Sequence, residues 1–584
     1  MRPPVAILTS RLQSAIETVL GEEFRGADPV LRRSTSPQFG DYQANAAMAL
    51  GKKVRRPPRE LAQAIIDALD VLDVCSSVEV AGPGFINLTL RNEALAEAAE
   101  ALLQDGARFA VPTVDPSARD CVVIDYSSPT LTKEMHVGHL RSTVIGDALA
   151  RTLDFAGHEV VRQNHYGEWG TQFGMLIEHL RTSGGTGGSV SIEDLNVFYQ
   201  DANARFTSDE SFKDLARARV VALQAGDPES LELWRQFVAA AKGHAEEVYE
   251  LLDVTLRPED ERPESSFNPV LDDLCAELEA KGVARVDDGA LCAFPDGFKN
   301  REGEPLALII RKSDGGYGYQ ATDLAAVKHR LADLGATRVV YVVDARQTLH
   351  LRMVFAVARN AGWVADGVRI EHVAFGTVMD ADGKPFKSRS GENVKLGEVL
   401  EEAVQRAGAT IAEKNPDLDP EQRQAVARAV GIGAVKWADL QNDRIKDYVF
   451  DWDRMLAFEG NSGPYLQYAH ARVRSIFRRG EIEDTSFLAN ADVVVTEDAE
   501  RALVLQLLTL PEVVDAVVDT LQPHRLATYS FELAQAFTAF FEHCPVLRAP
   551  DEETRTSRLA LCELTARTLQ LGLGLLGIET PDRM

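Results

Sequence analysis

Residues 121–163 decide the fold, and they read CVVIDYSSPTLTKEMHVGHLRSTVIGDALARTLDFAGHEVVRQ. The apolar run that ends at Asp125 predicts a buried strand. A helix is expected over about 137–155, with Gly157 as its stop, and a second apolar strand begins at Glu159. Strand, helix and strand in this order are the start of a parallel α/β sheet.

The whole chain is too long for one hydrophobic core. It has 584 residues, so about three domains are expected. Its composition, 45% hydrophobic and 26% charged, is ordinary for a soluble globular protein. The sequence contains no run of eighteen apolar residues, so no membrane span is predicted.

The cysteines and the net charge narrow the possible class of protein further. The six cysteines are scattered without a C-x-x-C pair, which argues against a zinc site and a disulfide scaffold and favours free thiols in the cytoplasm. The net charge of −27 argues against a general nucleic-acid binder. Two basic stretches are compatible with local phosphate contacts or with solvated surface: Lys52, Lys53, Arg55, Arg56 and Arg59, and Arg472, Arg474, Arg478 and Arg479.

The patterns along the chain predict three units. Residues 1–112 mix helical periodicity with a strand-like end, and 117–454 alternate strands and helices around a charged helical insertion at about 181–300. Residues 455–584 carry helical periodicity and predict an all-α bundle. Beyond the insertion, strands are expected at 305–312, 338–346 and 370–376, with a helix over 322–334.

The segment between the first strand and the first helix carries the chemistry. Open α/β sheets bind ligands at the carboxyl ends of their strands, and helix N-termini bind phosphate. Here the sequence is His136-Val137-Gly138-His139, and neither a dinucleotide-binding glycine motif nor a P-loop is present. Two histidines can donate hydrogen bonds to phosphate oxygens as pyrophosphate leaves, and a glycine lets a nucleotide approach the backbone. A purely structural pair of histidines is the alternative.

A second phosphate-directed element, DADGKPFKSRSGENVKL, follows the strand at 370–376. Its Lys384, Lys387 and Arg389 lie in a loop of Gly and Ser that can close over a triphosphate. Such a cluster alone is usually solvated, but together with H-x-G-H it indicates that the chain handles ATP.

The paired signatures resemble those of class I aminoacyl-tRNA synthetases, with HVGH as the first motif and FKSR in the place of the lysine-rich second motif. The chain is more specifically similar to arginyl-tRNA synthetases in five separated segments: DYSSPTLTKEMHVGHLRSTVIGD, NHYGEWGTQFG, YVVDARQTLHL, GKPFKSRSG and FDWDRMLAFEGNSGPYLQYAHAR. The resemblance runs from GDYQANAAMAL to PDRM. It implies a multidomain α/β fold: a Rossmann-like parallel-sheet catalytic domain with an insertion, an N-terminal α+β domain that contacts tRNA, and a C-terminal helical anticodon-binding domain.

The resemblance also implies the activity, that of an arginine–tRNA ligase. Such an enzyme activates L-arginine with ATP to arginyl-adenylate and transfers it to the 3′ end of tRNA(Arg), releasing AMP and pyrophosphate, and its first step needs tRNA. Mg²⁺ should accompany ATP through phosphates and water, so no dedicated metal site in the protein is predicted. A cytoplasmic monomer is the family-based expectation.

Catalytic roles follow residue by residue. His136 and His139 would stabilise the phosphate transition state, while Lys133, Lys387 and Arg389 would neutralise pyrophosphate. The second motif lacks its usual second lysine, and Lys133 stands where relatives with that gap carry one. The first-motif segment comprises Pro129, Thr130, Leu131, Thr132, Lys133, Glu134, Met135, His136, Val137, Gly138 and His139. ATP is expected to contact His136, Gly138, His139, Trp169, Gln172 and Lys387.

A guanidinium is planar and always charged, so a selective pocket needs carboxylates and neutral acceptors. Tyr319 and Asp323 are four apart and share a face if their helix begins early enough, although Asp323 near a helix start is also favourable on dipole grounds alone. Thr130 departs from the asparagine that most relatives have there. By resemblance, arginine binds Asp125, Ser127, Thr130, His139, Tyr319, Asp323 and Gln347.

For tRNA, the resemblance implies contacts through both terminal domains. Aromatic faces and arginine planes suit unstacked anticodon bases, whereas a role in the helix core is the alternative for the tyrosines. The expected contacts are Lys52, Lys53, Arg55, Arg56, Tyr465, Tyr468, His470 and Arg472.

Two other functions compete. A small-molecule nucleotidyltransferase also uses H-x-G-H, but it would not need the N-terminal and C-terminal domains. A non-catalytic synthetase-like protein that binds tRNA is the second alternative, and it predicts loss of the histidines or of the loop lysine, all of which are present.

Overall fold

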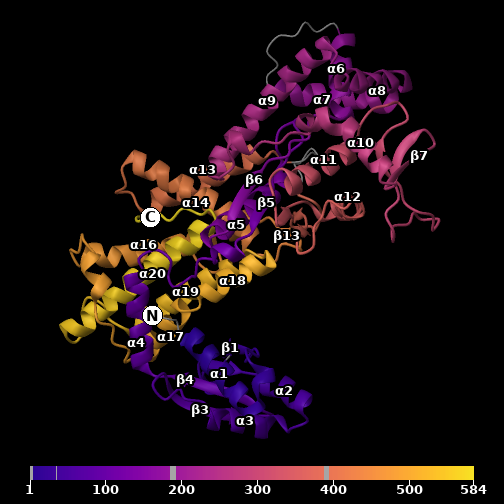
Figure 1. The fold of residues 1–584 in the computed structure, drawn as a ribbon. Coiled ribbons are helices and arrows are strands. Elements are labelled where there is room, and N and C mark those ends of the chain that lie inside the picture. The colour runs from indigo at the N-terminus through magenta and orange to yellow at the C-terminus, as the bar shows by residue number, and fades with distance from the viewer. Residues whose placement is uncertain (1–3, 35, 184–191, 387–393) are drawn as a thin grey trace.

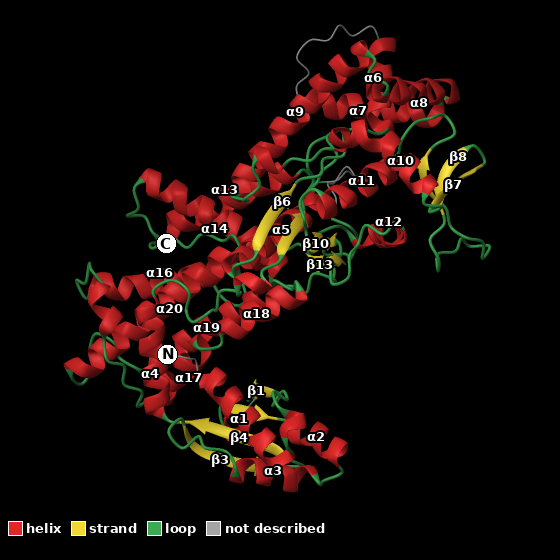
Figure 2. Ribbon diagram, viewed as in Figure 1, coloured by secondary structure: helices red, strands yellow, loops and turns green. Residues whose placement is uncertain are grey.

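A computed structural model describes residues 4–34, 36–183, 192–386 and 394–584. The chain extends from an N-terminal unit at one end to a group of insertion helices at the other, and a parallel sheet lies between them (Figure 1). Helices dominate the arrangement (Figure 2). None of the helices in the described residues combines the length and apolarity needed to cross a membrane.

The N-terminal unit packs helices on an antiparallel sheet with the strand order β1-β2-β4-β3. Side chains of β4 alternate between half-buried and buried, as expected for a sheet with one covered face. The helix α3 packs against β3 and β4. Its elements are α1 (Pro4–Leu20), β1 (Leu31–Arg33), β2 (Tyr42–Ala44), α2 (Ala46–Val54), α3 (Pro58–Asp67), β3 (Cys75–Ala81) and β4 (Phe85–Leu90).

The central sheet is parallel, in the order β11-β10-β5-β6. The chain passes from β5 to β6 on one side and later returns to place β10 on the other side of β5. The strand order therefore reverses between β5 and β10, and ligands of open α/β sheets bind at such a point. The strands are β5 (Cys121–Asp125), β6 (Glu159–Gln163), β10 (Arg338–Tyr341) and β11 (Arg369–His372).

The helix α5 (Val137–Phe155) joins β5 to β6 and has the bounds that the sequence predicts. Most of its residues are buried, because the sheet and the helices of the C-terminal half enclose it. A Cβ atom at Gly146 would lie 2.2 Å from the Cβ of Tyr126, so only glycine permits this close approach of helix and strand. The packing fixes the position of the helix start, where the two motif histidines lie.

The insertion, predicted as helical over about 181–300, contains an antiparallel sheet, β7-β8-β9, beside its helices. The strand expected at 305–312 is present as β9 but pairs with β8 in this sheet and not in the central one. The elements are α6 (Thr171–Thr182), α7 (Ile192–Ser208), α8 (Glu210–Gln224), α9 (Pro228–Leu252), α10 (Leu271–Ala280), β7 (Ala284–Asp287), β8 (Ala290–Ala293) and β9 (Leu308–Arg311).

The rest of the α/β unit leads into helices that share its core. The C-terminal helices belong to the same hydrophobic cluster as β5 and α5, so the two units meet over buried apolar surface. The elements are α11 (Tyr319–Ala332), α12 (Thr348–Asn360), β12 (Val378–Met379), α13 (Leu396–Lys414), α14 (Pro420–Leu440), β13 (Tyr448–Val449) and α15 (Trp452–Met455).

The C-terminal bundle also contacts the N-terminal unit, through α4 (Asn92–Asp105) and through α17 (Asp498–Leu507). Arg501 of α17 forms an ion pair with Asp41, and Arg33 donates to Thr509 Oγ1 at 3.2 Å. The helices are α16 (Gly463–Arg479), α17 (Asp498–Leu507), α18 (Leu510–Thr520), α19 (His524–His543) and α20 (Glu552–Leu575). Short 3-10 helices lie at Glu22–Phe24, Pro37–Phe39, Pro116–Ala118, Pro258–Asp260, Glu264–Val270, Ala345–Gln347 and Ser486–Asn490.

Candidate active site

A strained turn follows β5 at the reversal point of the sheet. Ser127 and Ser128 have φ angles of 66° and 45°, a conformation that non-glycine residues rarely adopt and that costs about 1–3 kcal/mol per residue. We call Ser127–Ser128 the elbow. Asn164, which follows β6, accepts from the Ser128 N–H at 3.0 Å, and Ser142 of α5 accepts from the Ser127 N–H at 3.0 Å. Hydrogen bonds from both sides thus hold the elbow.

The two histidines cap α5 through their Nδ1 atoms. His136 Nδ1 accepts from the Gly138 N–H at 3.0 Å, and His139 Nδ1 accepts from the His136 N–H at 3.0 Å. A neutral imidazole whose Nδ1 accepts must carry its proton on Nε2. Both rings therefore present an Nε2–H donor at the helix N-terminus, where an anion is also favoured by the helix dipole.

The surroundings keep both rings neutral. Burial lowers the pKa of His136 to about 4, and the charges of Lys133 and Arg346 add to the effect. Burial also lowers the pKa of His139 far below the ordinary histidine value, with further contributions from His136 and Lys133. At neutral pH the pair thus offers hydrogen-bond donors without a net charge of its own.

Glycine is required at position 138 for a structural reason as well as for the predicted approach of a nucleotide. A Cβ atom there would lie 2.7 Å from Cε1 of His136, so a side chain would push the His136 ring out of its capping position. Gly138 and Thr130 are exposed members of the first-motif segment. Its buried members are Pro129, Leu131, Thr132, Glu134, Met135 and Val137.

The insertion helix α7 contacts the segment just before the histidines. The Lys133 ammonium lies 5.7 Å from the centre of the Tyr199 ring, and the Glu134 N–H donates to Asn196 Oδ1 at 3.1 Å. Lys133 is half-buried and close enough to both histidines to influence their pKa values. The role of Lys133 in neutralising pyrophosphate stays a prediction.

The residues that follow the second motif lie beside the first motif. Lys387 and Arg389 lie outside the described residues, but the residues that follow them are paired with the first motif. The Val137 N–H donates to the Val394 carbonyl at 3.0 Å, and Lys395 Nζ lies 2.8 Å from Glu134 Oε2. The described chain therefore resumes, after the second motif, at the start of α5.

Gln172 and Trp169, which are both expected to contact ATP, differ in their exposure to solvent. Gln172, in the first turn of α6, is exposed and accepts from Thr132 Oγ1 at 3.0 Å, so it lies next to the first motif. Trp169 is only 5% exposed, packs edge-on against Trp234, and donates its indole N–H to Asn268 at 3.0 Å. The ATP contact of Trp169 remains a prediction, and its burial argues against it.

The side chains of Asp125 and Ser127 are buried and bonded to other side chains of the protein. Asp125 Oδ2 lies 2.8 Å from the buried Arg330 Nη2, and its Oδ1 accepts from Ser128 Oγ at 2.7 Å. The hydroxyl of Ser127 lies 2.7 Å from Tyr249 Oη and 2.9 Å from Thr143 Oγ1. Both residues lie at the site, but an internal guanidinium already neutralises Asp125.

Asp323 and Tyr319 meet as the helix spacing predicts, because α11 begins at Tyr319. His350 of α12 connects them. Its Nε2 lies 2.6 Å from Asp323 Oδ2, and Tyr319 packs edge-on against its ring at 4.9 Å. His165 Nε2 lies 3.6 Å from the other carboxylate oxygen. Tyr319 is 53% exposed, so this cluster opens to solvent.

The Asp323 carboxylate stays ionised. Burial raises its pKa, but the hydrogen bond from His350 and the charges of His350, His165 and Arg330 outweigh burial and hold the pKa below its ordinary value. Gln347 is exposed at the end of the 3-10 helix that follows β10. Thr130 is exposed and bridges to Gly167.

The predicted tRNA contacts divide into exposed and buried residues. Lys52, Lys53, Arg55 and Arg56 are all exposed at the end of α2. On α16, Tyr468 is 44% exposed, whereas Tyr465 packs against Phe531. Arg472 is half-buried over the Phe541 ring.

The position of His470 differs from the prediction that it contacts tRNA. It is fully buried, because the C-terminal tail covers this face of α16, and its Nδ1 faces the Pro581 carbonyl at 3.4 Å. A side chain without exposed surface cannot stack on an anticodon base, so His470 is not expected to contact tRNA.

No group of three or more His, Cys, Asp and Glu side chains in the described ranges is arranged to hold a metal ion. The sequence patterns do not identify several residues that shape the site, namely Asn164, Tyr249, Arg330, His350 and Lys395. The helix positions of Tyr249 and Arg330 look like ordinary core or surface positions. For His350 the YVVDARQTLHL segment was an available signal.

The chain matches three family profiles that follow its order. "Arginyl tRNA synthetase N terminal domain" matches residues 6–90, "tRNA synthetases class I (R), catalytic domain" matches 99–452, and "DALR anticodon binding domain" matches 466–584. An arginine–tRNA ligase of Thermobifida fusca is 54% identical over 100% of both chains. The resemblance inferred from the motifs is therefore confirmed.

Solved structures agree with the fold. The arginyl-tRNA synthetase of Plasmodium falciparum has a TM-score of 0.83 at 26% identity and covers 100% of both chains. That of Thermus thermophilus has a TM-score of 0.81 at 29% identity and covers 99% of this chain and 100% of its own. From its profiles, its full-length relative and its fold, the chain belongs to the arginyl-tRNA synthetase family of class I aminoacyl-tRNA synthetases.

Proposed function

We propose that this chain is an arginine–tRNA ligase, which makes arginyl-adenylate from L-arginine and ATP and transfers the arginyl group to the 3′ end of tRNA(Arg). The observation that carries this proposal is the pair of Nε2–H donors at the start of α5, at the reversal point of a parallel sheet. The family membership of the chain selects arginine as the amino acid.

In the first step the arginine carboxylate attacks the α-phosphorus of ATP. A carboxylate–phosphorus bond forms, the bond to the bridging oxygen breaks, and pyrophosphate leaves. His136 and His139 donate to the phosphate oxygens that gain charge. Lys133, with Lys387 and Arg389 from the second motif, neutralises pyrophosphate, and the pairing of Val394 with Val137 supports their placement beside α5.

Arginine is recognised by the ionised Asp323 and by Tyr319. A carboxylate can accept two parallel hydrogen bonds from a guanidinium, and a half-exposed tyrosine supplies an aromatic edge and a hydroxyl. Asp323 is better suited than Asp125, because Arg330 already compensates the charge of Asp125. Thr130, Gln347 and His139 complete the proposed pocket.

In the second step the terminal ribose hydroxyl of tRNA attacks the acyl carbon, and AMP leaves. We infer that tRNA is also needed for the first step, as in the family. The exposed cations at the end of α2 and the exposed Tyr468 are the proposed contacts of the two terminal domains, whose bounds we place at 1–112 and 455–584. The catalytic unit is placed at 117–454.

Mg²⁺ is proposed to accompany ATP, held mainly by phosphate oxygens and water, where it would neutralise phosphate charge. We also infer a cytoplasmic monomer. All six cysteines are free thiols, which is the usual state in a reducing compartment.

Pyrophosphate exchange with each proteinogenic amino acid, with and without tRNA, tests the proposal. We expect exchange with arginine only, and only when tRNA is present. Exchange without any arginine requirement would overturn the assignment. Exchange with arginine but without tRNA would keep the ligase assignment and reject the tRNA requirement.

A further inference from the structure

Tyr249 of the insertion helix α9 reaches across to the elbow of the catalytic unit. Its side chain is 7% exposed, and its hydroxyl lies 2.7 Å from Ser127 Oγ and 3.1 Å from Asn164 Nδ2. The oxygen of the same Asn164 side chain accepts from the Ser128 N–H. Tyr249 is thus bonded, directly or through Asn164, to both residues of the elbow.

A network of hydrogen bonds connects Tyr249 to the first motif. Thr143 Oγ1 donates to Ser127 Oγ at 2.9 Å and to the His139 carbonyl oxygen at 2.8 Å. The Ser127 and Tyr249 hydroxyls share a hydrogen bond, and Tyr249 also accepts from the amide of Asn164. A continuous run of hydrogen bonds therefore links Asn164 to His139.

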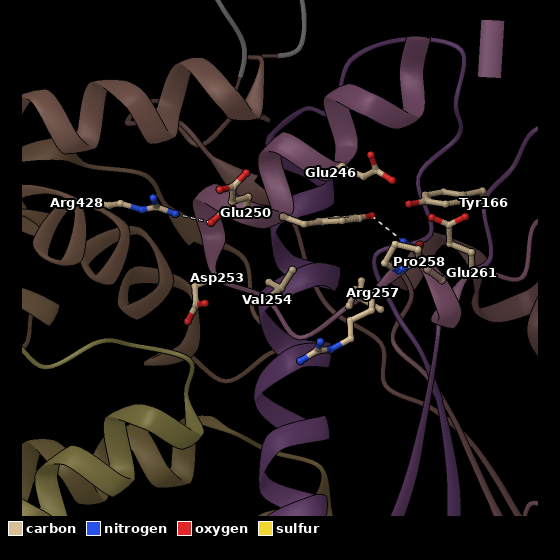
Figure 3. A pocket seen from close by; sticks show the side chains of 12 residues that line it. Tyr166, Glu246, Glu250, Asp253, Val254, Arg257, Pro258, Glu261 and Arg428 are labelled. Atoms are coloured by element: carbon tan, nitrogen blue, oxygen red, sulfur yellow. Dashed lines mark hydrogen bonds between the residues drawn. The ribbon is translucent and has the colours of Figure 1, made fainter. Parts of the chain in front are cut away.

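The outer side of Tyr249 is open. A cavity of about 460 Å³ lies there, lined by Asn164, Tyr166 and Tyr249, and carboxylates such as Glu246 and Glu261 surround it (Figure 3). Tyr249 is also a buried member of the main hydrophobic cluster, so packing holds its ring while the hydrogen bonds direct its hydroxyl to the elbow. Tyr166, whose hydroxyl is a further hydrogen-bond neighbour of Tyr249, belongs to the same wall.

The elbow needs such support. Two consecutive left-handed residues are retained only where their surroundings over-determine them. The elbow lies directly before Pro129 and the first-motif segment, so a shift there moves the residues that receive ATP and arginine. Displacements of about 1 Å at a reacting centre can lower rates by about a hundredfold.

We propose that Tyr249 is a positioning residue for adenylate formation, which holds the elbow and, through Ser127 and Thr143, the backbone of His139 in the reactive geometry. This inference rests on the proposed function and deepens it, because it makes the insertion a working part of the active site. Tyr249 does not touch the reacting atoms. It acts through the serine hydroxyl and the asparagine amide that it bonds.

The test is Tyr249→Phe, which removes the hydroxyl and keeps the ring. In arginine-dependent pyrophosphate exchange we expect kcat, normalised to titrated active sites, to fall about tenfold, with KM for ATP and arginine within about threefold of the parent chain. The matched control is Tyr529→Phe in α19, a tyrosine that is 2% exposed and donates to Leu507 at 3.4 Å. A normal kcat in Tyr249→Phe, or a loss equal to that of the control, would reject the proposal.

A double variant tests the route. If Tyr249 acts through Thr143, combining Tyr249→Phe with Thr143→Val lowers kcat no further than the worse single variant does. Independent, multiplied losses would contradict the hydrogen-bond chain.

Deuterium uptake separates this inference from the proposed function. Peptides that cover 126–139 should exchange faster in Tyr249→Phe than in the parent chain and unchanged in Tyr529→Phe. This readout requires no activity, so an inactive parent chain would reject the ligase assignment while the elbow is still tested. Unchanged uptake in Tyr249→Phe would reject the positioning role.

Discussion

Asp125 and Arg330 are separated by 205 positions in the chain and meet in the interior, with 2.8 Å between Oδ2 and Nη2. Their side chains are 6% and 0% exposed. The Arg330 Nε also donates to Gln163 at 2.6 Å, so the guanidinium ties the ends of β5 and β6 to α11. The carboxylate at the end of β5 therefore belongs to a structural ion pair beside the substrate pocket.

Replacing Arg330 alone should destabilise the folded chain more than replacing both members of the pair. Arg330→Met leaves the Asp125 carboxylate buried without a partner, and we expect a loss of about 3–5 kcal/mol of unfolding free energy. Adding Asp125→Asn removes the stranded charge and should restore part of that loss. Urea unfolding of the single and double variants measures both effects, and equal stability of the two would contradict the ion-pair argument.

The pair of motif histidines predicts a specific pH dependence of stability. The pKa of His136 is about 4 in the folded chain, against an ordinary value of about 6.5 when unfolded. Between these values the unfolded chain binds a proton that the folded chain does not, so stability is full above about pH 6.5 and falls as the pH drops towards 4. The contribution of His136 is about 3 kcal/mol over this range.

His136→Gln should make the stability profile less steep between pH 6.5 and 4, with the remaining slope coming from His139 and measured by chemical unfolding at several pH values. His543, an exposed histidine at the end of α19, supplies the control variant His543→Gln, which should leave the profile unchanged. An unaltered profile in His136→Gln would show that its neutral state is not enforced by the fold.

Local periodicity was enough to predict the central α/β elements. The helix α5 has the predicted bounds, because a turn segment precedes it and Gly157, at φ 99°, ends it. The sheet of the insertion was missed because its strands have only four residues each and little alternation, as in β7. The placement of β9 in that sheet depends on pairing with β8, which periodicity does not reveal.

The site was predictable where residues are close in sequence and not where partners are distant. The helical spacing of Tyr319 and Asp323 brought them together as expected. The pairing of Asp125 with Arg330 and of Glu134 with Lys395 needs the folded chain, since no spacing rule connects them. His470 was misplaced because the surface that covers it comes from the C-terminal tail.

The exposed cations of α2 predict a salt-dependent contribution to tRNA binding. In Arg55→Ala combined with Arg56→Ala, we expect KM for tRNA to rise and the slope of log affinity against log salt to shrink by about 0.7–0.9 per lost phosphate contact. KM for arginine should not change. Arg301→Ala combined with Arg359→Ala removes equal charge from exposed positions elsewhere and should leave the slope unaltered. Identical slopes in both double variants would remove α2 from the tRNA interface.

Asp323 predicts how the pocket selects a charged side chain. Asp323→Asn keeps the size of the side chain and loses the charge, so we expect KM for arginine to rise about a hundredfold, or about 3 kcal/mol. Citrulline, the neutral isostere of arginine, should lose much less affinity, so the preference for arginine over citrulline should collapse. Exchange kinetics or calorimetry with both ligands measure this preference.

Asp333 provides the matched control on the same helix. It also faces a histidine, with Oδ2 2.7 Å from Nδ1 of His329, but it is 69% exposed and lies at the other end of α11. Asp333→Asn should leave the preference intact. If Asp323→Asn keeps the parent preference while Asp125→Asn abolishes it, the guanidinium is read at the end of β5, and Arg330 must give up its partner when arginine binds.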